Sequence, residues 1–321
     1  MNTDRVPKIL VTSLSKKVPL IRELQKALSK ISTQGRIIGA DIDKFCIGSY
    51  FVDDFWEMPL TSDLSDDALI AVINQFQITG IIPTRDAELL YFSSKRKLLE
   101  DIGVHLMLSN EQTVNICLDK LLFTETLKQS NFSVIESSLD VEQLKSERFV
   151  VKERYGAGSI GMAIAVTKQQ AIAYAKKLKH PMFQPFIEGD EFSVDVFFNK
   201  QSQCMGVIPR KREVIIHGES QVTSTLEDTV MENLCQSIGE SLGLTGHGVF
   251  QLIKTKHNKY KVIELNSRFG GASTLSIAAG LDSLFWFVLE SIGESLDTYP
   301  MKRTKKQLKQ VRYAMDKIVE I

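Results

Sequence analysis

Short apolar runs alternate with longer amphipathic stretches over the first hundred residues of the chain. The short runs are rich in branched residues, which predicts strands, and the longer stretches place their apolar residues on one helical face. The predicted strands lie at 8–12, 35–41 and 78–84, and the predicted helices at 18–31, 65–76 and 86–103. Strand–helix alternation at this spacing indicates a parallel sheet with helices on its faces.

The pattern changes beyond residue 110. A helix is predicted at 111–130, and two strand-like runs at 149–152 and 162–166 then flank a glycine-rich stretch. Beyond residue 182 the predicted strands become longer. These strands lie at 191–198, 204–216, 248–255 and 259–266, with helices predicted at 226–242, 283–293 and 302–320. The chain is therefore expected to combine an α/β part with an α+β part.

Composition narrows the class of protein. The 321 residues are 43% apolar and 24% charged, which is typical of a soluble globular chain. The 39 basic residues balance the 39 acidic ones, which argues against a nucleic-acid partner. No apolar run approaches the ~20 residues that a membrane helix needs, and the N-terminus lacks the apolar core of a secretory signal. We therefore expect a cytoplasmic protein with no membrane partner.

The glycine-rich stretch Gly156–Gly161 matches the spacing G-x-G-x-x-G, which is typical of dinucleotide-binding loops. Such a loop must lead into a helix, whereas this one connects two predicted strands, and no acidic residue follows about twenty positions later. An NAD-dependent oxidoreductase is therefore excluded. The backbone N–H groups of a glycine-rich hairpin can still cover phosphates, with Lys152 supplying a positive charge. A plain surface hairpin is the alternative.

Polar side chains gather on one face of the predicted strand at 259–266. Side chains alternate between the faces of a strand, so Glu264, Asn266 and Arg268 fall on one side, and Ile263 and Leu265 fall on the other. A carboxylate and an amide beside an arginine indicate a binding site. The alternative is a solvated polar face on which Glu264 pairs with Arg268.

The strand at 248–255 is expected to pair with this one as an antiparallel hairpin. If residues 257–258 form a two-residue loop, Gln251 lies directly across from Glu264. One carboxylate and two amide oxygens then converge, and these ligands suit Mg²⁺ that is also held by substrate phosphates.

At these residues the chain resembles the ATP-grasp superfamily, and it is most similar to the group of the carbamoyl phosphate synthetase large subunit and the pyrrolysine-biosynthesis ligase. The resemblance covers nearly the whole chain. Six motifs occur in the family's order: IIPTRDAELLYFSSKRKLLEDIGV, LDKLLFTETLKQSNFSV, FVVKERYGAGSIGM, FQPFIEGDEFSVDVFF, VIPRKREVIIHGES and FQLI…VIELNSRFGGAS. The resemblance implies a Rossmann-like pre-ATP-grasp domain with a parallel sheet at 1–110. It also implies a two-lobed ATP-grasp fold with antiparallel sheets, whose small lobe with a glycine-rich lid spans 111–182 and whose large lobe with a metal site spans 183–321.

The resemblance also implies a role for individual residues. The implied nucleotide-binding residues are Lys120 and Lys152 at the phosphates, Gly156, Gly158 and Ser159 in the lid, Gln184, Phe186 and Ile187 in the adenine hinge, and Glu191 at the ribose. The implied metal ligands are Gln251, Glu264 and Asn266, and the implied catalytic residues are Arg210, at a phosphate or the acyl intermediate, and Arg268, at the transferring phosphoryl group. His217 and His247 lack a metal-ligand spacing and are expected to be structural.

Two positions depart from the family pattern. Gln251 stands where many relatives carry an acid, and an amide binds Mg²⁺ more weakly than a carboxylate. Glu153 stands where relatives often have proline, which changes the geometry of the lid without removing a phosphate contact.

The activity that the resemblance implies is ATP-dependent ligation of a carboxylate to an amine through an acyl phosphate. ATP and Mg²⁺ are the expected cofactors, with Mn²⁺ as an alternative metal, and small carboxylates and amines are the expected partners. Carbamoyl-phosphate-type synthesis and a non-catalytic, regulatory ATP-binding protein remain alternatives, and a homodimer is left open.

Overall fold

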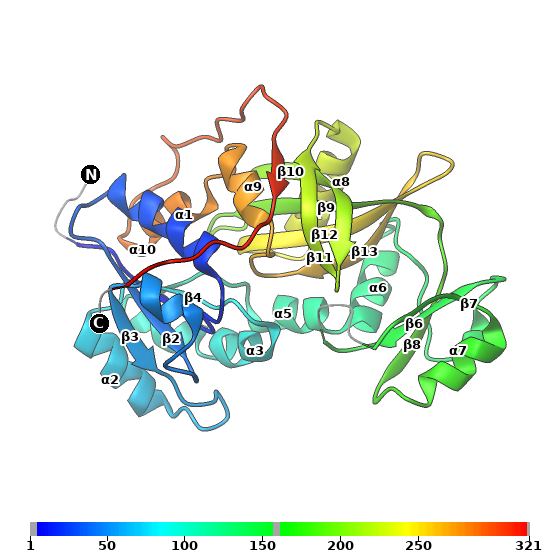
Figure 1. Ribbon diagram of the computed structural model, residues 1–321, viewed down its shortest axis with the longest axis horizontal. Coiled ribbons are helices and arrows are strands. Elements are labelled where there is room, and N and C mark those ends of the chain that lie inside the picture. Colours follow the sequence, from blue (N-terminus) through cyan, green and yellow to red (C-terminus); the bar gives the residue numbers. More distant parts are fainter. Residues whose placement is uncertain (1–4, 157–160, 320–321) are drawn as a thin grey trace.

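A computed structural model of the chain describes residues 5–156 and 161–319. The N-terminal domain is built on a five-stranded parallel sheet with the strand order β3-β2-β1-β4-β5 (Figure 1). Its strands are β1 (Lys8–Val11), β2 (Arg36–Asp41), β3 (Asp54–Glu57), β4 (Gly80–Ile82) and β5 (His105–Leu106). Its helices are α1 (Val18–Ser29), α2 (Asp66–Phe76), α3 (Asp86–Ser94) and α4 (Arg96–Asp101), and η1 (Ile47–Phe51) is a short 3₁₀ helix. The predicted α/β organisation of this part is confirmed.

Sequence signals account for the helices of this domain. Ser65 caps α2 by accepting a hydrogen bond from the backbone N–H of Ala68, as serine commonly does at a helix start. The stretch predicted as one helix at 86–103 is two helices, because Lys95 leaves helical geometry with φ −91° and ψ 1°. Its side chain packs over the ring of Tyr91 and forms an ion pair with Asp66.

A small three-stranded sheet with the order β7-β6-β8 follows. It contains β6 (Phe149–Glu153), β7 (Ala163–Val166) and β8 (Pro181–Pro185), and it packs against α7 (Lys168–Ala175). β6 and β7 form the antiparallel hairpin predicted around the glycine-rich stretch. The short 3₁₀ helix η2 (Val141–Gln143) closes the same small core.

The single helix predicted at 111–130 is also divided. α5 (Glu111–Leu118) and α6 (Lys120–Gln129) meet at Asp119, which has the extended geometry φ −98° and ψ 99°. The carboxylate of Asp119 accepts hydrogen bonds from the backbone N–H groups of Leu121 and Leu122, so it caps α6. Helix α6 therefore begins at Lys120, which is one of the residues singled out from the sequence.

The C-terminal half forms a six-stranded antiparallel sheet with the order β13-β12-β9-β10-β11-β14. Its strands are β9 (Gly189–Phe198), β10 (Cys204–Ile216), β11 (Glu219–Thr225), β12 (Gly246–Thr255), β13 (Tyr260–Asn266) and β14 (Lys309–Val311). Apolar side chains of β9 face α8 (Thr229–Ser241) and α6, forming one core. α9 (Ser273–Ala278) and α10 (Ser283–Ser291) follow β13, and α10 packs against α1 and the N-terminal sheet. The predicted antiparallel sheets are thus confirmed.

The helix predicted at 302–320 is wrong: over the described residues 302–319 the chain is extended and contains β14. β14 pairs with the edge strand β11, where Val222 lies opposite Val311. Basic residues of this segment form ion pairs with acids of the sheet, including Lys309 with Glu213. The segment then runs back toward the N-terminal domain (Figure 1). There the ammonium group of Lys317 donates a 2.5 Å hydrogen bond to the carbonyl of Tyr50.

Among the helices that the structure describes, none combines the length and the apolar character that a membrane span requires.

Candidate functional site

A cleft of about 870 Å³ is lined by residues of both the small sheet and the six-stranded sheet. Every described residue that was predicted to bind nucleotide or metal or to act in catalysis lines it: Lys120, Lys152, Gly156, Gln184, Phe186, Ile187, Glu191, Arg210, Gln251, Glu264, Asn266 and Arg268. Gly158 and Ser159, which were expected in the lid, lie outside the described residues. The fold therefore gathers residues that are separated by up to about 150 positions in the sequence into one cavity.

The metal-ligand candidates lie on neighbouring strands. Gln251 on β12 pairs directly with Glu264 on β13, and the amide nitrogen of Asn266 donates a 3.2 Å hydrogen bond to the Glu264 carboxylate. Among the residues that the structure describes, no group of three or more His, Cys, Asp and Glu side chains could hold a metal alone. One carboxylate and two amides fit Mg²⁺ only when substrate phosphates complete its coordination.

The Gln251–Glu264 pairing is formed without the predicted two-residue turn. The turn has three residues, 256–258, and it is closed by a hydrogen bond from the backbone N–H of Thr255 to the carbonyl of Lys259. A β-bulge at Ile263 then shifts the register by one residue. Ile263, which was expected on the opposite face, consequently lines the cleft as well.

Lys152 on β6 is buried in the wall of the cleft. Burial lowers the pKa of its ammonium group to about 8, with the positive charge of Lys120 acting in the same direction and the Glu264 carboxylate opposing both. Within the described part of the chain, no residue forms an ion pair or a hydrogen bond with this ammonium group. A buried cation without a partner is costly, and an anionic ligand in the cleft would relieve that cost.

Asp119 joins the start of α6 to the base of the glycine-rich stretch. Its two carboxylate oxygens accept hydrogen bonds of 2.7 and 2.6 Å from Arg154, and the backbone N–H of Lys120 donates to the carbonyl of Arg154. Burial would raise the pKa of Asp119, but Arg154 and the capped N–H groups of α6 together lower it. The Lys120 ammonium group donates a 2.5 Å hydrogen bond to the carbonyl of Gly156. Asp119 was not predicted as a site residue, although an acid before a helix is a recognisable capping signal.

A chain of hydroxyl groups orients Gln184. Its amide nitrogen lies 2.8 Å from the Ser137 hydroxyl, which lies 3.1 Å from the hydroxyl of Thr124. Thr124 donates in turn to the carbonyl of Lys120, and the single proton of Ser137 serves Thr124 or the carbonyl of Ile135, so Ser137 accepts from Gln184. The amide oxygen of Gln184 is therefore left for the cleft. Nothing in the sequence pattern pointed to Ser137.

Of the two backbone N–H groups that follow Pro185, one has an acceptor in the described part of the chain and one does not. The N–H of Phe186 donates to the carbonyl of Arg148. The N–H of Ile187 has no acceptor within the described part of the chain. Strand pairing thus ends before Ile187, which lines the cleft and keeps its N–H for a ligand.

Arg212 and Glu191 form an ion pair of 3.0 Å at the rim of the cleft. Arg212 also contacts the amide oxygen of Gln251 at 3.5 Å and the Ser220 hydroxyl at 3.0 Å. Arg212 therefore links the Glu191 end of the cleft to the Gln251–Glu264 pair.

Arg268 is held by the N-terminal domain. Its guanidinium group forms a two-point ion pair with Asp86, the first residue of α3, at 2.5 and 2.7 Å. A further N–H donates to the carbonyl of Phe269. The group still lines the cleft and keeps one N–H on each terminal nitrogen for a ligand.

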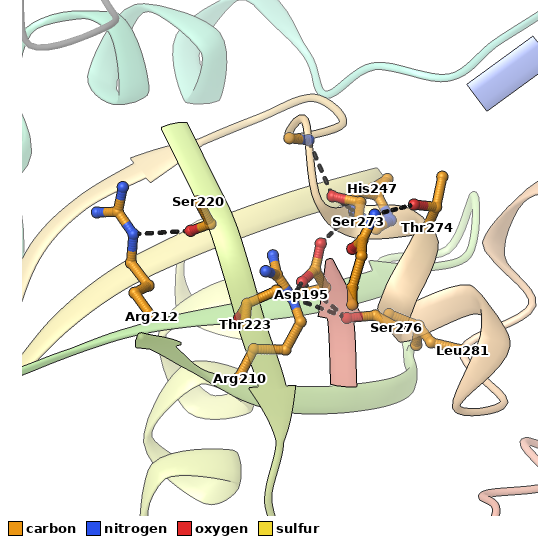
Figure 2. Close-up of polar contacts among 12 residues, drawn as sticks. Asp195, Arg210, Arg212, Ser220, Thr223, His247, Ser273, Thr274, Ser276 and Leu281 are labelled. Atoms are coloured by element: carbon orange, nitrogen blue, oxygen red, sulfur yellow. Dashed lines mark hydrogen bonds and ion pairs between the residues drawn. The ribbon is translucent and has the colours of Figure 1, made fainter. Parts of the chain in front are cut away.

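Arg210 lies deeper, at the wall shared by β10 and α9. It is 2% exposed, and its Nε donates to the Asp195 carboxylate at 2.5 Å and to the Ser276 hydroxyl at 3.1 Å (Figure 2). Burial would raise the pKa of Asp195, but Arg210 and His247 outweigh it and keep the carboxylate ionised. The ion pair makes this wall electrically neutral.

Two family models match the chain. Residues 9–107 match the model described as "PylC-like, N-terminal domain", and residues 177–314 match the model described as "ATP-grasp in the biosynthetic pathway with Ter operon". The arginine-specific large chain of mitochondrial carbamoyl phosphate synthase from Neurospora crassa is 21% identical over 322 residues, a match that includes 92% of this chain. The chain spans only 27% of the length of that relative.

Solved structures show the same fold. A biotin carboxylase from Campylobacter jejuni, in complex with β-γ-ATP, superposes with a TM-score of 0.75 at 14% identity, covering 94% of this chain and 75% of that one. The biotin carboxylase domain of 2-oxoglutarate carboxylase from Hydrogenobacter thermophilus, with MgADP, ADP and bicarbonate, gives a TM-score of 0.76 at 15% identity, with coverages of 95% and 74%. N5-carboxyaminoimidazole synthetase from Staphylococcus aureus with ADP gives 0.71 at 17% identity, with coverages of 92% and 80%. The resemblance drawn from the motifs is confirmed.

Proposed function

We propose that this chain, a PylC-like N-terminal domain followed by an ATP-grasp domain, is an ATP-dependent carboxylate–amine ligase. A carboxylate does not react with an amine in water, because its oxygen is a poor leaving group. In the proposed reaction the carboxylate attacks the γ-phosphate of ATP, giving an acyl phosphate and ADP. The amine then attacks the acyl carbon, phosphate leaves with the bonding electrons, and an amide forms.

One observation carries this proposal: the buried ammonium group of Lys152, which has no partner among the described residues, and the Glu264 carboxylate line the same cleft. Lys152 and Lys120 would neutralise triphosphate charge from the small sheet. Glu264, Gln251 and Asn266 would hold Mg²⁺ from the six-stranded sheet, and the bound metal would stabilise charge on the β- and γ-phosphates. Positioning and charge neutralisation of this kind supply most of the rate in phosphoryl transfer.

The other end of the cleft suits the base of the nucleotide. The oriented amide oxygen of Gln184 would accept from the adenine amino group, and the N–H of Ile187 would donate to a ring nitrogen. Phe186 would form the rest of the hinge, and Glu191 would accept hydrogen bonds from the ribose through the carboxylate oxygen that Arg212 leaves open. Gly156, with Gly158 and Ser159, would cover the phosphates.

Arg210 and Arg268 would act where the acyl phosphate forms. Both line the cleft, as do Gly270 and Gly271. Each keeps N–H donors that can meet oxygen atoms on which negative charge develops. The ion pair with Asp86 would place the positive charge of Arg268 at the boundary with the N-terminal domain, where a second substrate could enter.

A screen of carboxylate–amine pairs tests the proposal directly. Phosphate release would be measured with MgATP and pooled amino acids, sugar acids and amines, followed by mass spectrometry of the products. We expect a pair that gives stoichiometric ADP, phosphate and amide. MgATP binding without turnover for any pair would instead favour the non-catalytic reading, and absence of MgATP binding would overturn the proposal. Light scattering with and without MgATP would test for a homodimer.

A further inference from the structure

Arg210 contains a polar donor that the protein leaves without a partner. Its Nη1 is fully buried, and no described residue accepts a hydrogen bond from it. Buried guanidinium nitrogens are normally satisfied, so such a donor points to an acceptor that comes from a ligand. Because Arg210 lines the cleft, the acceptor can reach it from there.

The direction of this donor is fixed by Asp195. One oxygen of the Asp195 carboxylate accepts from Arg210 Nε at 2.5 Å and from the Ser276 hydroxyl at 2.8 Å. The other oxygen lies 3.0 Å from Nε2 of His247 (Figure 2). A carboxylate held on both oxygens cannot rotate, so the guanidinium group that it holds keeps one orientation.

His247 contacts the oxygen of Asp195 that Arg210 does not contact. Its side chain is 0% exposed, its ring stacks on Phe269 at 4.0 Å, and its Nδ1 lies 3.0 Å from the Ser283 hydroxyl. Burial lowers the pKa of His247 more than Asp195 raises it, so the ring is neutral at pH 7. Because Asp195 can only accept, the ring proton belongs on Nε2.

The same Nε2–H also reaches the loop that follows β13. It lies 3.2 Å from the Ser273 hydroxyl oxygen, which accepts from the backbone N–H of Gly270 at 2.9 Å. Gly270 and Gly271 line the cleft. His247 therefore connects Arg210, through Asp195, with the glycine loop, through Ser273.

This cluster is not a hydrolytic triad. In a Ser–His–Asp triad the acid and the serine contact different ring nitrogens. Here Asp195 and Ser273 contact the same nitrogen of His247, and Ser283 contacts the other one. Both serines are 0% exposed, so no substrate could reach either hydroxyl.

We propose that His247 is a positioning residue for an oxyanion subsite in which Arg210 Nη1 and the Gly270–Gly271 loop bind the phosphoryl group of the acyl phosphate. The proposal rests on the proposed ligase function and adds a residue to it. The Arg210–Asp195 pair is neutral, and only Nε of Arg210 donates to described residues, so the terminal nitrogens keep N–H donors for phosphoryl or carboxylate oxygens. His247 acts without touching the ligand, because it holds the two walls of the subsite in register.

Orthophosphate bound beside MgADP is the probe for this subsite. Calorimetry would first measure MgADP binding and then orthophosphate binding to the saturated MgADP complex. In His247→Phe, which keeps a ring against Phe269, we expect at least tenfold weaker orthophosphate binding with MgADP affinity within twofold of wild type. His247→Gln, which keeps a donor near the Nε2 position, should stay within threefold of wild type for both ligands.

Two further variants distinguish a change in the subsite from a failure of the protein to fold. Ser273→Ala removes the hydroxyl that joins His247 to the backbone N–H of Gly270 and leaves the His247–Asp195 contact in place. It should weaken orthophosphate binding several-fold, which keeps the test open if His247→Phe does not fold. His257→Phe, at the exposed β12–β13 turn, is the matched control and should change neither affinity. Wild-type orthophosphate affinity in His247→Phe or in Ser273→Ala, or no orthophosphate binding by the wild-type MgADP complex, would overturn the subsite. Failure of the wild-type protein to bind MgADP would overturn the ligase proposal itself.

Discussion

Gln251 lies directly across from Glu264 in the β12–β13 ladder, at the point where a bulge at Ile263 shifts the register of the two strands. The bulge places a carboxylate and an amide side by side on the face of the sheet that forms the cleft. Because both residues sit on paired strands, their side chains are held by the backbone hydrogen bonds of the ladder and not by a loop. This pair is the basis of the first two predictions.

Replacing Glu264 by alanine should reduce ADP formation by about 10²-fold or more, since the only carboxylate of the proposed metal site is lost. Its described hydrogen bond is with Asn266 alone, so the melting temperature should stay close to that of the wild-type protein. ADP release and a thermal melt measure the two effects. Turnover at the wild-type rate in a folded Glu264→Ala protein would remove the metal role.

Replacing Gln251 by glutamate should strengthen Mg²⁺ binding, because a carboxylate binds the ion more tightly than an amide. We expect the Mg²⁺ concentration for half-maximal ADP formation to fall roughly tenfold, since contacts to ionised groups are about twice as strong as neutral ones. Arg212, 3.5 Å away, would accommodate the added charge. Gln251→Leu is the control and should raise the Mg²⁺ requirement; an unchanged requirement in both variants would exclude Gln251 as a ligand.

MgATP affinity should depend on pH through Lys152. The pKa of this group is lowered to about 8 in the free protein, so the ammonium form that attracts phosphate is present below that pH and is lost above it. The affinity should therefore fall as the pH rises from 7 to 9, by up to about tenfold per pH unit above the pKa. Calorimetry at several pH values measures the slope. Lys152→Arg should flatten it because arginine stays charged, and an equal slope in both proteins would contradict the assignment.

Purine selectivity should depend on Ser137. Its hydroxyl fixes the amide of Gln184 with the oxygen toward the cleft, an acceptor that suits the amino group of adenine and opposes the carbonyl of guanine. Ser137→Ala frees the amide to rotate, so the preference for ATP over GTP should fall roughly fivefold, in keeping with about 1 kcal/mol for one hydrogen bond. Competition binding of ATP and GTP measures it. Ser241→Ala, at an exposed position of α8, is the control, and an undiminished ATP preference in Ser137→Ala would rule out this orientation mechanism.

The Asp86–Arg268 ion pair should stabilise the contact between the N-terminal domain and the cleft. Its geometry is two-point and its side chains are mostly buried, so Asp86→Asn should lower the free energy of unfolding by about 1–2 kcal/mol, between the values for exposed and buried pairs. Urea unfolding of the single and double variants at these positions would give the coupling energy. Additive effects of the two substitutions would show that the pair contributes nothing.

The strands that carry the cleft could be predicted because their polar and apolar positions alternate. That alternation identified Glu264 with Asn266 on one hairpin, whereas the glycine-rich stretch pointed to Lys152 on the other, and both hairpins are present. The turn between β12 and β13 could not be predicted, because a three-residue turn followed by a bulge gives the same Gln251–Glu264 pairing as a two-residue turn.

The contacts that hold the site were not visible in the sequence. Asp86 and Arg268 are 182 positions apart, and no local period relates them. Asp119 interrupts what looks like one helix, because its side chain satisfies the N–H groups of α6 and the guanidinium group of Arg154 together. The C-terminal segment has strong helix formers but little apolar surface to bury, so pairing with the edge strand β11 prevailed over its helical propensity.

β14 pairs with β11 and thereby covers the edge of the six-stranded sheet. Without residues 309–311, the outer strand of a six-stranded sheet would present a row of unpaired backbone donors and acceptors to other molecules. A shortened version of the chain should therefore self-associate through its sheet margins at high concentration, even with every cleft residue intact, and purification tags are better placed at the other terminus.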